Sequence, residues 1–309
     1  MNSLPWEPDR PLTAQGARAA IAARFPEVDS RALEHLGSGW QFDVYLTPDG
    51  WVFRFPRRAW IADLFEQERR VHELVSRFLA PKIAVPKIEL MGEPAEGFPH
   101  RFAGHRFISG VPADAVDADL EVLLAREIGE ALGTIHSIPV GDARAAGVAE
   151  LDMDEPGRKD WLERGLDRAS QLRGYEPAID PALDWVADLS LPLHEYDGPV
   201  RVIHHDLGPE HLIVEAKTGQ LTGIVDWTDT ILGDAARDFV GLVTWRGWGF
   251  TEEVLRSYRL PLDEGFRDRL RFMARLISTI WLTEAHSHGI DIARYVKGVR
   301  NAFAAGSAS

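Results

Sequence analysis

Three side chains in the last third of the chain, those of Asp206, His211 and Asp226, are of types that bind metal ions and accept protons. Two β-prone runs, 211–214 and 221–225, are separated by a short polar segment of the kind that makes a turn. In a β-hairpin, residues at equal distances from the turn face each other, so His211 and Asp226 would meet at the open end. Asp206 lies on the loop that leads to the same end. The spacing therefore predicts that two carboxylates and an imidazole converge.

This combination suits phosphoryl transfer. The reaction needs one carboxylate that orients a hydroxyl group and accepts its proton, and ligands that hold Mg²⁺ against the phosphates of a nucleotide. Asp206 fits the first role, and Asp226 with His211 fits the second. Asp226 is the better ligand because Mg²⁺ prefers oxygen, whereas imidazole suits zinc, copper or nickel. Each residue alone is more often an ordinary loop residue, and only the joint spacing favours a site.

The motifs around these residues resemble those of the antibiotic phosphotransferases, the aminoglycoside and macrolide kinases of the wider protein-kinase-like superfamily. The motifs that carry the resemblance are His204-x-Asp206 with His211, Ile224-Val225-Asp226-Trp227, and Gly233-Asp234-x-x-x-Asp238-Phe239. The resemblance implies that Asp206 is the catalytic base and Asp226 the principal metal ligand. It also implies that His204 braces the loop and that Asp238 supports it from the C-terminal lobe.

One residue departs from the usual pattern of this superfamily, which has Asn where this chain has His211. Macrolide kinases are similar to the chain here, with His at that step and an Asp-Trp-(Ser/Thr)-acid run like 226–229. The departure leaves the second metal position open but does not change the reaction class.

The N-terminal third predicts the elements that would hold a nucleotide. Residues 13–25 are expected to form a helix with Thr13 as its N-cap. A Gly-rich turn at 36–40 precedes two strands, 42–46 and 51–56. This segment resembles a nucleotide-covering hairpin, which implies that Gly37 and Ser38 lie at the phosphates.

A cation in the second strand has a predicted partner in the following helix. Arg54 alternates with apolar neighbours at the place where kinases carry a phosphate-binding Lys, and macrolide kinases, which this segment resembles, likewise have Arg. In the helix expected over 59–79, Glu68 falls on the apolar face. Because a buried Glu is costly without a partner, we expect an Arg54–Glu68 ion pair. An ion pair between Glu68 and a neighbouring Arg on the helix surface is the alternative.

The predicted lobe boundary follows two further strands, at 82–91 and 105–108. Gly110 and Pro112 indicate a hinge, and the resemblance implies that the purine base binds near Ile108 and Ser109. We expect a two-lobed α+β protein-kinase-like fold. Its nucleotide-binding N-lobe would span 1–108. Its mostly helical C-lobe, with the catalytic loop and the substrate cleft, would span 109–309.

The C-terminal part predicts helices at 120–138, 235–248 and 265–288. His136, at the end of the first helix, is expected to be a core or cap residue. The acidic, Trp-containing segment 152–197 would line the substrate cleft, as in the resembled family. Low-weight candidates for substrate contact are Asp229, Trp245, Trp281 and Glu284. A metal site at Glu284, His286 and His288 is disfavoured, since an i,i+2 His pair on a helix faces two directions.

The bulk composition narrows the classes of molecule that the protein could bind. The chain has 309 residues, a formal net charge of −14 and no cysteine. This charge disfavours nucleic acid and anionic membrane and is compatible with a cationic substrate. Without cysteine there is no thiolate nucleophile or thiolate metal site. No apolar run is long enough to span a bilayer, and the N-terminal residues lack the features of a signal peptide. We expect a cytoplasmic protein, and the sequence does not predict its oligomeric state.

The predicted activity is transfer of the γ-phosphoryl group of ATP or GTP to a hydroxyl of an aminoglycoside, with Mg²⁺ as cofactor. The net charge and the acidic segment favour the aminoglycoside. His211, Trp227 and Arg54 favour the alternative, a macrolide 2′-phosphotransferase of the same fold. Two further alternatives are a metal hydrolase that uses the imidazoles around Asp206 and a non-catalytic nucleotide-binding module.

Overall fold

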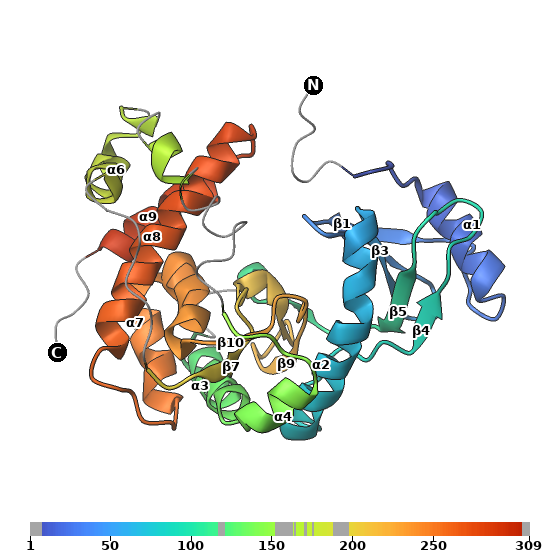
Figure 1. Cartoon of the computed structure of the whole chain (residues 1–309), viewed down its shortest axis with the longest axis horizontal. Coiled ribbons are helices and arrows are strands. Elements are labelled where there is room, and N and C mark those ends of the chain that lie inside the picture. Colours follow the sequence, from blue (N-terminus) through green and yellow to red (C-terminus); the bar gives the residue numbers. More distant parts are fainter. Residues whose placement is uncertain are drawn as a thin grey trace. The chain divides into compact units, whose positions relative to one another are not determined.

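The protein divides into two compact units, Met1–Ser109 and Gly110–Ser309, in a computed structural model (Figure 1). The structure describes residues 8–116, 121–151, 163, 165–169, 172–174, 176–187 and 198–304.

The N-terminal unit is an antiparallel five-stranded sheet with helices on both faces. The strand order is β1-β2-β3-β5-β4. The strands are β1 Glu34–Ser38, β2 Phe42–Leu46, β3 Trp51–Pro56, β4 Leu90–Gly92 and β5 Phe102–Arg106. The helices are α1 Ala14–Arg24, the 3₁₀ helix η1 Ala59–Leu64 and α2 Phe65–Leu79. As predicted, Thr13 caps α1, accepting a hydrogen bond from the Gly16 N–H.

Four predicted elements in this unit have wrong boundaries. The expected Gly-rich turn is shorter, because residues up to Ser38 belong to β1. The helix expected over 59–79 begins with a 3₁₀ turn and becomes α-helical only at Phe65. The strand expected over 82–91 is reduced to a short edge strand, and β5 begins at Phe102 and ends before Ile108. Pro86 inside the segment 82–91 explains its shortening, since Pro cannot donate to a sheet ladder.

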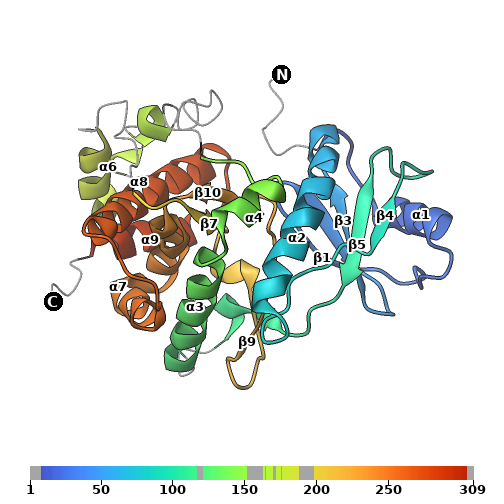
Figure 2. The same cartoon turned by 60° about the horizontal axis from the view of Figure 1, so that its bottom comes forward.

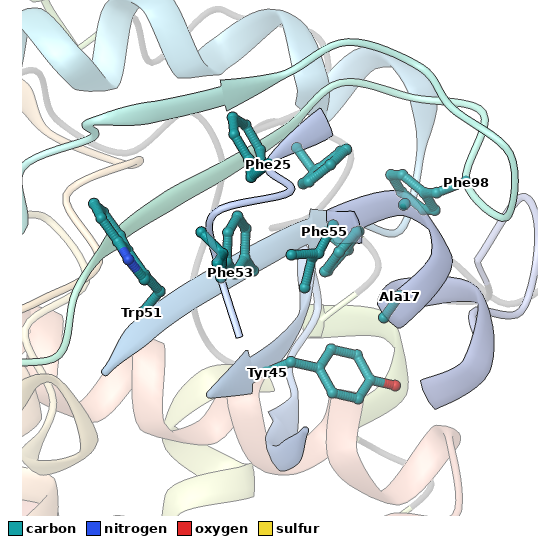
Figure 3. Packing of buried hydrophobic residues seen from close by; sticks show 11 residues of the cluster. Ala17, Phe25, Tyr45, Trp51, Phe53, Phe55 and Phe98 are labelled. Carbon is teal, nitrogen blue, oxygen red and sulfur yellow. The ribbon is translucent and has the colours of Figure 1, made fainter. Parts of the chain in front are cut away.

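The strand alternation of β3 separates an aromatic core from a polar pair. Phe53 and Phe55 point to one face, where they pack with Phe102 and residues of α1 (Figure 3). The rings of Phe55 and Phe102 are stacked with centroids 4.8 Å apart. Arg54 projects to the opposite face, where Phe42 packs with residues of η1 and α2. β3 therefore lies at the centre of the unit and carries Arg54 into its interior.

The C-terminal unit is mostly helical. The principal helices are α3 Glu121–His136, α4 Val140–Ala145, α6 Asp180–Ala187, α7 Val240–Ser257, α8 Phe266–Ser287 and α9 Ala293–Phe303. Helices α3 and α9 both pack on α7 (Figure 2). The expected helix at 235–248 is instead the 3₁₀ helix η7 Ala235–Phe239 followed by α7, which kinks at Gly247. None of the described helices is long and apolar enough to cross a membrane.

Two small sheets carry the loops of this unit. One pairs β7 Arg201–Ile203 with β10 Ile231–Gly233, and the other has the order β6-β8-β9. Its strands are β6 Val111–Pro112, β8 Leu212–Val214 and β9 Leu221–Ile224. The short 3₁₀ helices are η2 Ala113–Ala115, η5 Pro177–Ile179 and η6 Pro209–His211. The antiparallel sheet of the N-terminal unit and the helical C-terminal unit confirm the predicted α+β fold.

The predicted hairpin forms, but its register differs from the prediction. Leu212 pairs with Ile224, and the Val225 N–H donates to the carbonyl oxygen of His211 at 3.0 Å. His211 therefore faces Val225 and not Asp226. The physical reason is the position of the turn, which is centred between Lys217 and Thr218, because Val214 pairs with Leu221 and the Glu215 N–H donates to the carbonyl oxygen of Gln220. The β-bulge beside Ile213 and Val214 offsets only part of this difference.

Candidate active site

The predicted convergence of Asp206, His211 and Asp226 is confirmed. His211 Nε2 lies 3.6 Å from Asp226 Oδ2, and His211 Nδ1 lies 3.9 Å from Asp206 Oδ2. Asp226 reaches this position although Val225 takes its place in the ladder. Its backbone is left-handed, with φ 63°, so its side chain does not follow the alternation of β9. The Thr228 hydroxyl donates to Asp226 Oδ1 at 3.2 Å.

The tautomer of His211 follows from its backbone contact. Its Nδ1 is 2.7 Å from the carbonyl oxygen of Asp206, and a carbonyl oxygen only accepts, so Nδ1 carries a proton. In the neutral imidazole the lone pair of Nε2 then faces the Asp226 carboxylate. Burial disfavours the charged ring, but the carboxylates of Asp226 and Asp206 outweigh it and raise the pKa of His211. The space between Nε2 and Asp226 therefore favours a positive charge.

A third carboxylate adds to this negative field. Burial among protein groups, together with the charges of Asp206 and Asp226, raises the pKa of Asp229 to about 6. The side chain remains accessible to solvent. Two of these three carboxylates, those of Asp206 and Asp226, are also partly exposed. The three carboxylates therefore present a negative field to the solvent.

One buried carboxylate holds the backbone of the loop that carries Asp206. Asp238 accepts hydrogen bonds from the N–H groups of His204 at 2.8 Å and His205 at 2.7 Å. It also accepts from His136 Nε2 at 3.0 Å. Although burial alone would raise the pKa of Asp238, the His136 imidazole and the other donors lower it. His205 has a strained backbone with φ 72°, directly before Asp206, and Asp238 holds it there.

The His204 side chain ties the loop to the hairpin. Its Nε2 donates to the carbonyl oxygen of Val225 at 3.0 Å, and its ring packs 4.7 Å from that of Trp227. Both His204 and Trp227 are fully buried. Burial lowers the pKa of His204, as does the nearby His211. Since Val225 directly precedes Asp226, this contact couples the two carboxylate-bearing segments.

Three features that support the loop were not predicted from the sequence. Tyr258, at the end of α7, makes a 2.9 Å hydrogen bond with His136 Nδ1. Arg269 of α8 donates to Asp234 at 2.6 Å, and Asp234 in turn accepts the Ala236 N–H that begins η7. A Cβ added to Gly241 would lie 1.9 Å from the carbonyl oxygen of Leu207, so only glycine lets α7 approach the loop this closely. Helical spacing in the sequence suggests none of these long-range contacts.

In the N-terminal unit the predicted Arg54–Glu68 ion pair is confirmed. Arg54 Nη1 donates to Glu68 Oε1, and both side chains are buried. The guanidinium carbon of Arg54 also lies 3.9 Å from the centre of the Phe42 ring. Burial disfavours ionised Glu68, but the charge of Arg54 and then the contact with His72 lower its pKa overall. The Glu68 side chain is buried and so does not form a pair at the helix surface, and Arg69 pairs with Glu66 and Glu73.

The predicted nucleotide-loop residues lie in different settings. A Cβ on Gly37 would meet no atom within 4 Å, so this backbone is open to a ligand. The Ser38 hydroxyl instead donates to Asp43 Oδ1 at 2.5 Å and is 3.0 Å from His35 Nε2. Ile108 is half-buried and Ser109 is exposed, both after β5.

The weaker candidates for substrate contact include Trp245 on α7 and Trp281 and Glu284 on α8. Trp245 stacks under the Arg246 guanidinium at 4.4 Å. Trp281 lies 5.6 Å from the Arg237 guanidinium, and Arg237 also acts on the charge of Asp229. Glu284, one turn further along α8, pairs with Arg168 at 3.5 Å. Most of the acidic segment 152–197 lies outside the described residues.

The described side chains could hold a metal ion only together with other ligands. In the described parts of the chain, no group of three or more His, Asp or Glu side chains could by itself hold a metal ion. That includes Glu284, His286 and His288. Mg²⁺ in phosphoryl-transfer sites takes only one or two protein carboxylates and completes its shell with phosphate oxygens and water. Asp226 and the facing His211 Nε2 fit such a partial donor set.

Several solved structures share this fold. Solved structures with a matching fold include the GDP complex of an aminoglycoside 2′-phosphotransferase-IIIa, with a TM-score of 0.72, 21% identity, and coverage of 94% of this chain and 98% of that one. The macrolide 2′-phosphotransferase MphH from Brachybacterium faecium matches with a TM-score of 0.61, 22% identity, and coverage of 92% and 97%. The fold is thus the kinase-like fold of these phosphotransferases.

The sequence also matches a family model, which is more specific than the shared fold. Residues 32–275 match the model of the phosphotransferase enzyme family APH, and the chain belongs to this family. An uncharacterized protein of Bacillus subtilis (strain 168), YcbJ, is 23% identical over 239 residues, covering 72% of each chain. The predictions of an antibiotic-phosphotransferase-like chain and of a phosphotransferase activity are confirmed.

Proposed function

We propose that this protein transfers the γ-phosphoryl group of ATP or GTP to a hydroxyl of an antibiotic, with an aminoglycoside as the first candidate. The observation that carries the proposal is the convergence of Asp206, His211 and Asp226 on a strained loop that Asp238 holds by its backbone. Membership of the phosphotransferase family supports it. A metal hydrolase is disfavoured, since the Arg54–Glu68 pair has no role in one.

Each residue of the group has a proposed role. Asp206 orients the acceptor hydroxyl and accepts its proton, and its half-exposed side chain is accessible to a substrate. Asp226 and His211 would hold Mg²⁺, which neutralises charge on the phosphates when bound. The Nδ1–H bond of His211 to the Asp206 backbone keeps Nε2 aimed at Asp226. His211 therefore replaces the usual Asn without loss of a donor at this place.

The N-terminal unit is proposed to bind the nucleotide. Arg54, held by Glu68, would contact the phosphates. The open backbone at Gly37 and Ser38 would cover them, and the backbone at Ile108 and Ser109 would contact the purine base. Under this proposal residues 1–108 bind the nucleotide and 109–309 carry catalysis and the acceptor. A solved structure with the same fold contains GDP, which supports a purine nucleotide as donor.

Two observations bear on the acceptor. The cluster of carboxylates at Asp206, Asp226 and Asp229 favours a substrate with ammonium groups. Structures of similar fold include a streptomycin–ATP complex. Against this, Glu284 is neutralised by Arg168, and Trp245 and Trp281 carry stacked arginines. These last contacts favour the second candidate, a macrolide.

The test is phosphate transfer by the purified protein with Mg²⁺, using ATP and GTP separately against aminoglycoside and macrolide panels. Replacing the base in Asp206→Asn should lower kcat by about 10²–10⁴-fold and leave nucleotide binding unchanged. Glu210→Gln is the matched control, because it removes an exposed carboxylate from the same loop. Full turnover in Asp206→Asn would refute the assignment of the base. Nucleotide binding without transfer to either panel would favour a non-catalytic module.

A further inference from the structure

A buried histidine lies beside the Arg54–Glu68 pair. His72 follows Glu68 by one turn of α2, so both side chains lie on the same face of the helix. His72 is 1% exposed and Glu68 2%. Leu74 and Val75 next to it are buried apolar residues, and an apolar side chain at 72 would avoid the cost of burying an imidazole. The polar ring therefore needs a physical explanation.

The contacts of His72 point to the Glu68 carboxylate. Its Nε2 lies 3.4 Å from Glu68 Oε1, the same oxygen that accepts the hydrogen bond from Arg54. Neither ring nitrogen of His72 makes a hydrogen bond to another described residue. The imidazole thus packs against the oxygen through which Glu68 holds Arg54, and no other described polar group directs its ring.

A second imidazole approaches the same group from the sheet. His105 of β5 is buried, and its Nδ1 is 2.9 Å from the carbonyl oxygen of Arg106. Burial, outweighing that contact, lowers the pKa of His105 to about 4, and the charges of Arg54 and His72 act in the same direction. His105 is therefore neutral at ordinary pH and does not compete with Arg54 for Glu68.

We propose that His72 is a positioning residue for the phosphate-binding cation: it restrains the Glu68 carboxylate so that Arg54 stays extended over Phe42. A Glu side chain has several rotatable bonds, and its oxygens leave a fixed position unless neighbours restrain them. Arg54 holds one oxygen, Phe42 supports the guanidinium face, and His72 fills the side of the carboxylate toward the next helical turn. The inference rests on the proposed role of Arg54.

The test measures binding of a non-hydrolysable nucleotide with Mg²⁺, together with steady-state kinetics. His72→Leu should raise the nucleotide Kd and KM about tenfold, comparable to a lost charge-assisted contact, and change kcat at saturation less than about twofold. His72→Gln, whose polar amide can also contact the Glu68 carboxylate, should restore most of the affinity. Val75→Ala is the control, because it removes buried packing from the same helix without touching the ion pair.

A double-mutant cycle distinguishes the proposed role of His72 from the proposed phosphate contact of Arg54. If His72 acts through Glu68 and Arg54, His72→Leu should have no further effect on nucleotide Kd in an Arg54→Ala background. Equal effects in both backgrounds, or an effect of Val75→Ala as large as that of His72→Leu, would overturn the role of His72 alone. An Arg54→Ala variant with unchanged nucleotide affinity would overturn the proposed phosphate contact, and the inference with it.

Discussion

Asp238→Asn should both destabilise the C-terminal unit and impair catalysis. Oδ2 of Asp238 accepts from the His204 N–H and from His136, and Oδ1 accepts from the His205 N–H. An asparagine serves two of these donors best with its oxygen at the Oδ2 position. Its NH₂ group then faces the His205 N–H, so two donors meet and one buried bond is lost. The variant therefore affects the residue next to Asp206.

The magnitude follows from that single lost bond. A hydrogen bond to a charged acceptor contributes about 1.5–3 kcal/mol, and an orphaned buried N–H adds a further penalty, so we expect a loss of about 3 kcal/mol. For a unit of roughly 200 residues this lowers the Tm by about 6–12 °C. His205, no longer held at φ 72°, would relax and displace Asp206. A displacement near 1 Å lowers turnover by about 10²-fold.

Thermal unfolding and steady-state kinetics with nucleotide and acceptor measure both effects. Asp268→Asn is the control, because it weakens an exposed ion pair with Arg271 in the same unit and does not touch the loop. The lowered pKa of Asp238 adds a signature. Its ionised form stabilises the fold above an ordinary carboxyl pKa of about 4, and this stability is lost as pH falls toward the folded pKa. Asp238→Asn should flatten that acid dependence. A Tm within 2 °C of wild type and unchanged kcat would refute the reasoning.

Two other substitutions test the loop and its charges. Gly241→Ala should lower kcat and Tm, because its Cβ would lie 1.9 Å from the Leu207 carbonyl oxygen. Gly249→Ala in the same helix should change neither or raise the Tm slightly, because its Cβ would meet no atom within 4 Å. Equal behaviour of the two variants would contradict the steric argument. Asp229 has a pKa raised to about 6, so its ionised form destabilises the fold as pH rises through that value. Asp229→Asn should raise the Tm at pH 8 and much less at pH 4.5, and an equal gain at both would exclude a charge effect.

Local patterns in the sequence were sufficient for the elements and for several partners. The Arg54–Glu68 pair was predictable because a helical period placed an acid on an apolar face and a strand placed a cation among buried neighbours. Thr13 was predictable as a cap for a similarly local reason. The hairpin was predictable from two β-prone runs and a turn. Its register was not, because no distinctive residue marks where the turn is centred or where the bulge falls.

The contacts between residues far apart in the sequence could be found only from the structure. His136 was expected to be a core or cap residue, but its bonds to Asp238 and Tyr258 span 102 and 122 residues of sequence. Nothing in the spacing of these side chains indicates that they meet. The Arg269–Asp234 pair and the close approach of Gly241 to the loop are of the same kind.

The sequence by itself thus determined the reaction class, the two-part architecture and which carboxylates lie near His211, because residue types, turns and periodicities are local properties of the chain. Tertiary structure alone decided how those carboxylates are held. Asp226 meets His211 through a left-handed backbone and not through strand pairing. The backbone directly before Asp206 is held by a buried carboxylate on a distant helical turn. Such contacts depend on the packing of whole helices, which local sequence does not encode.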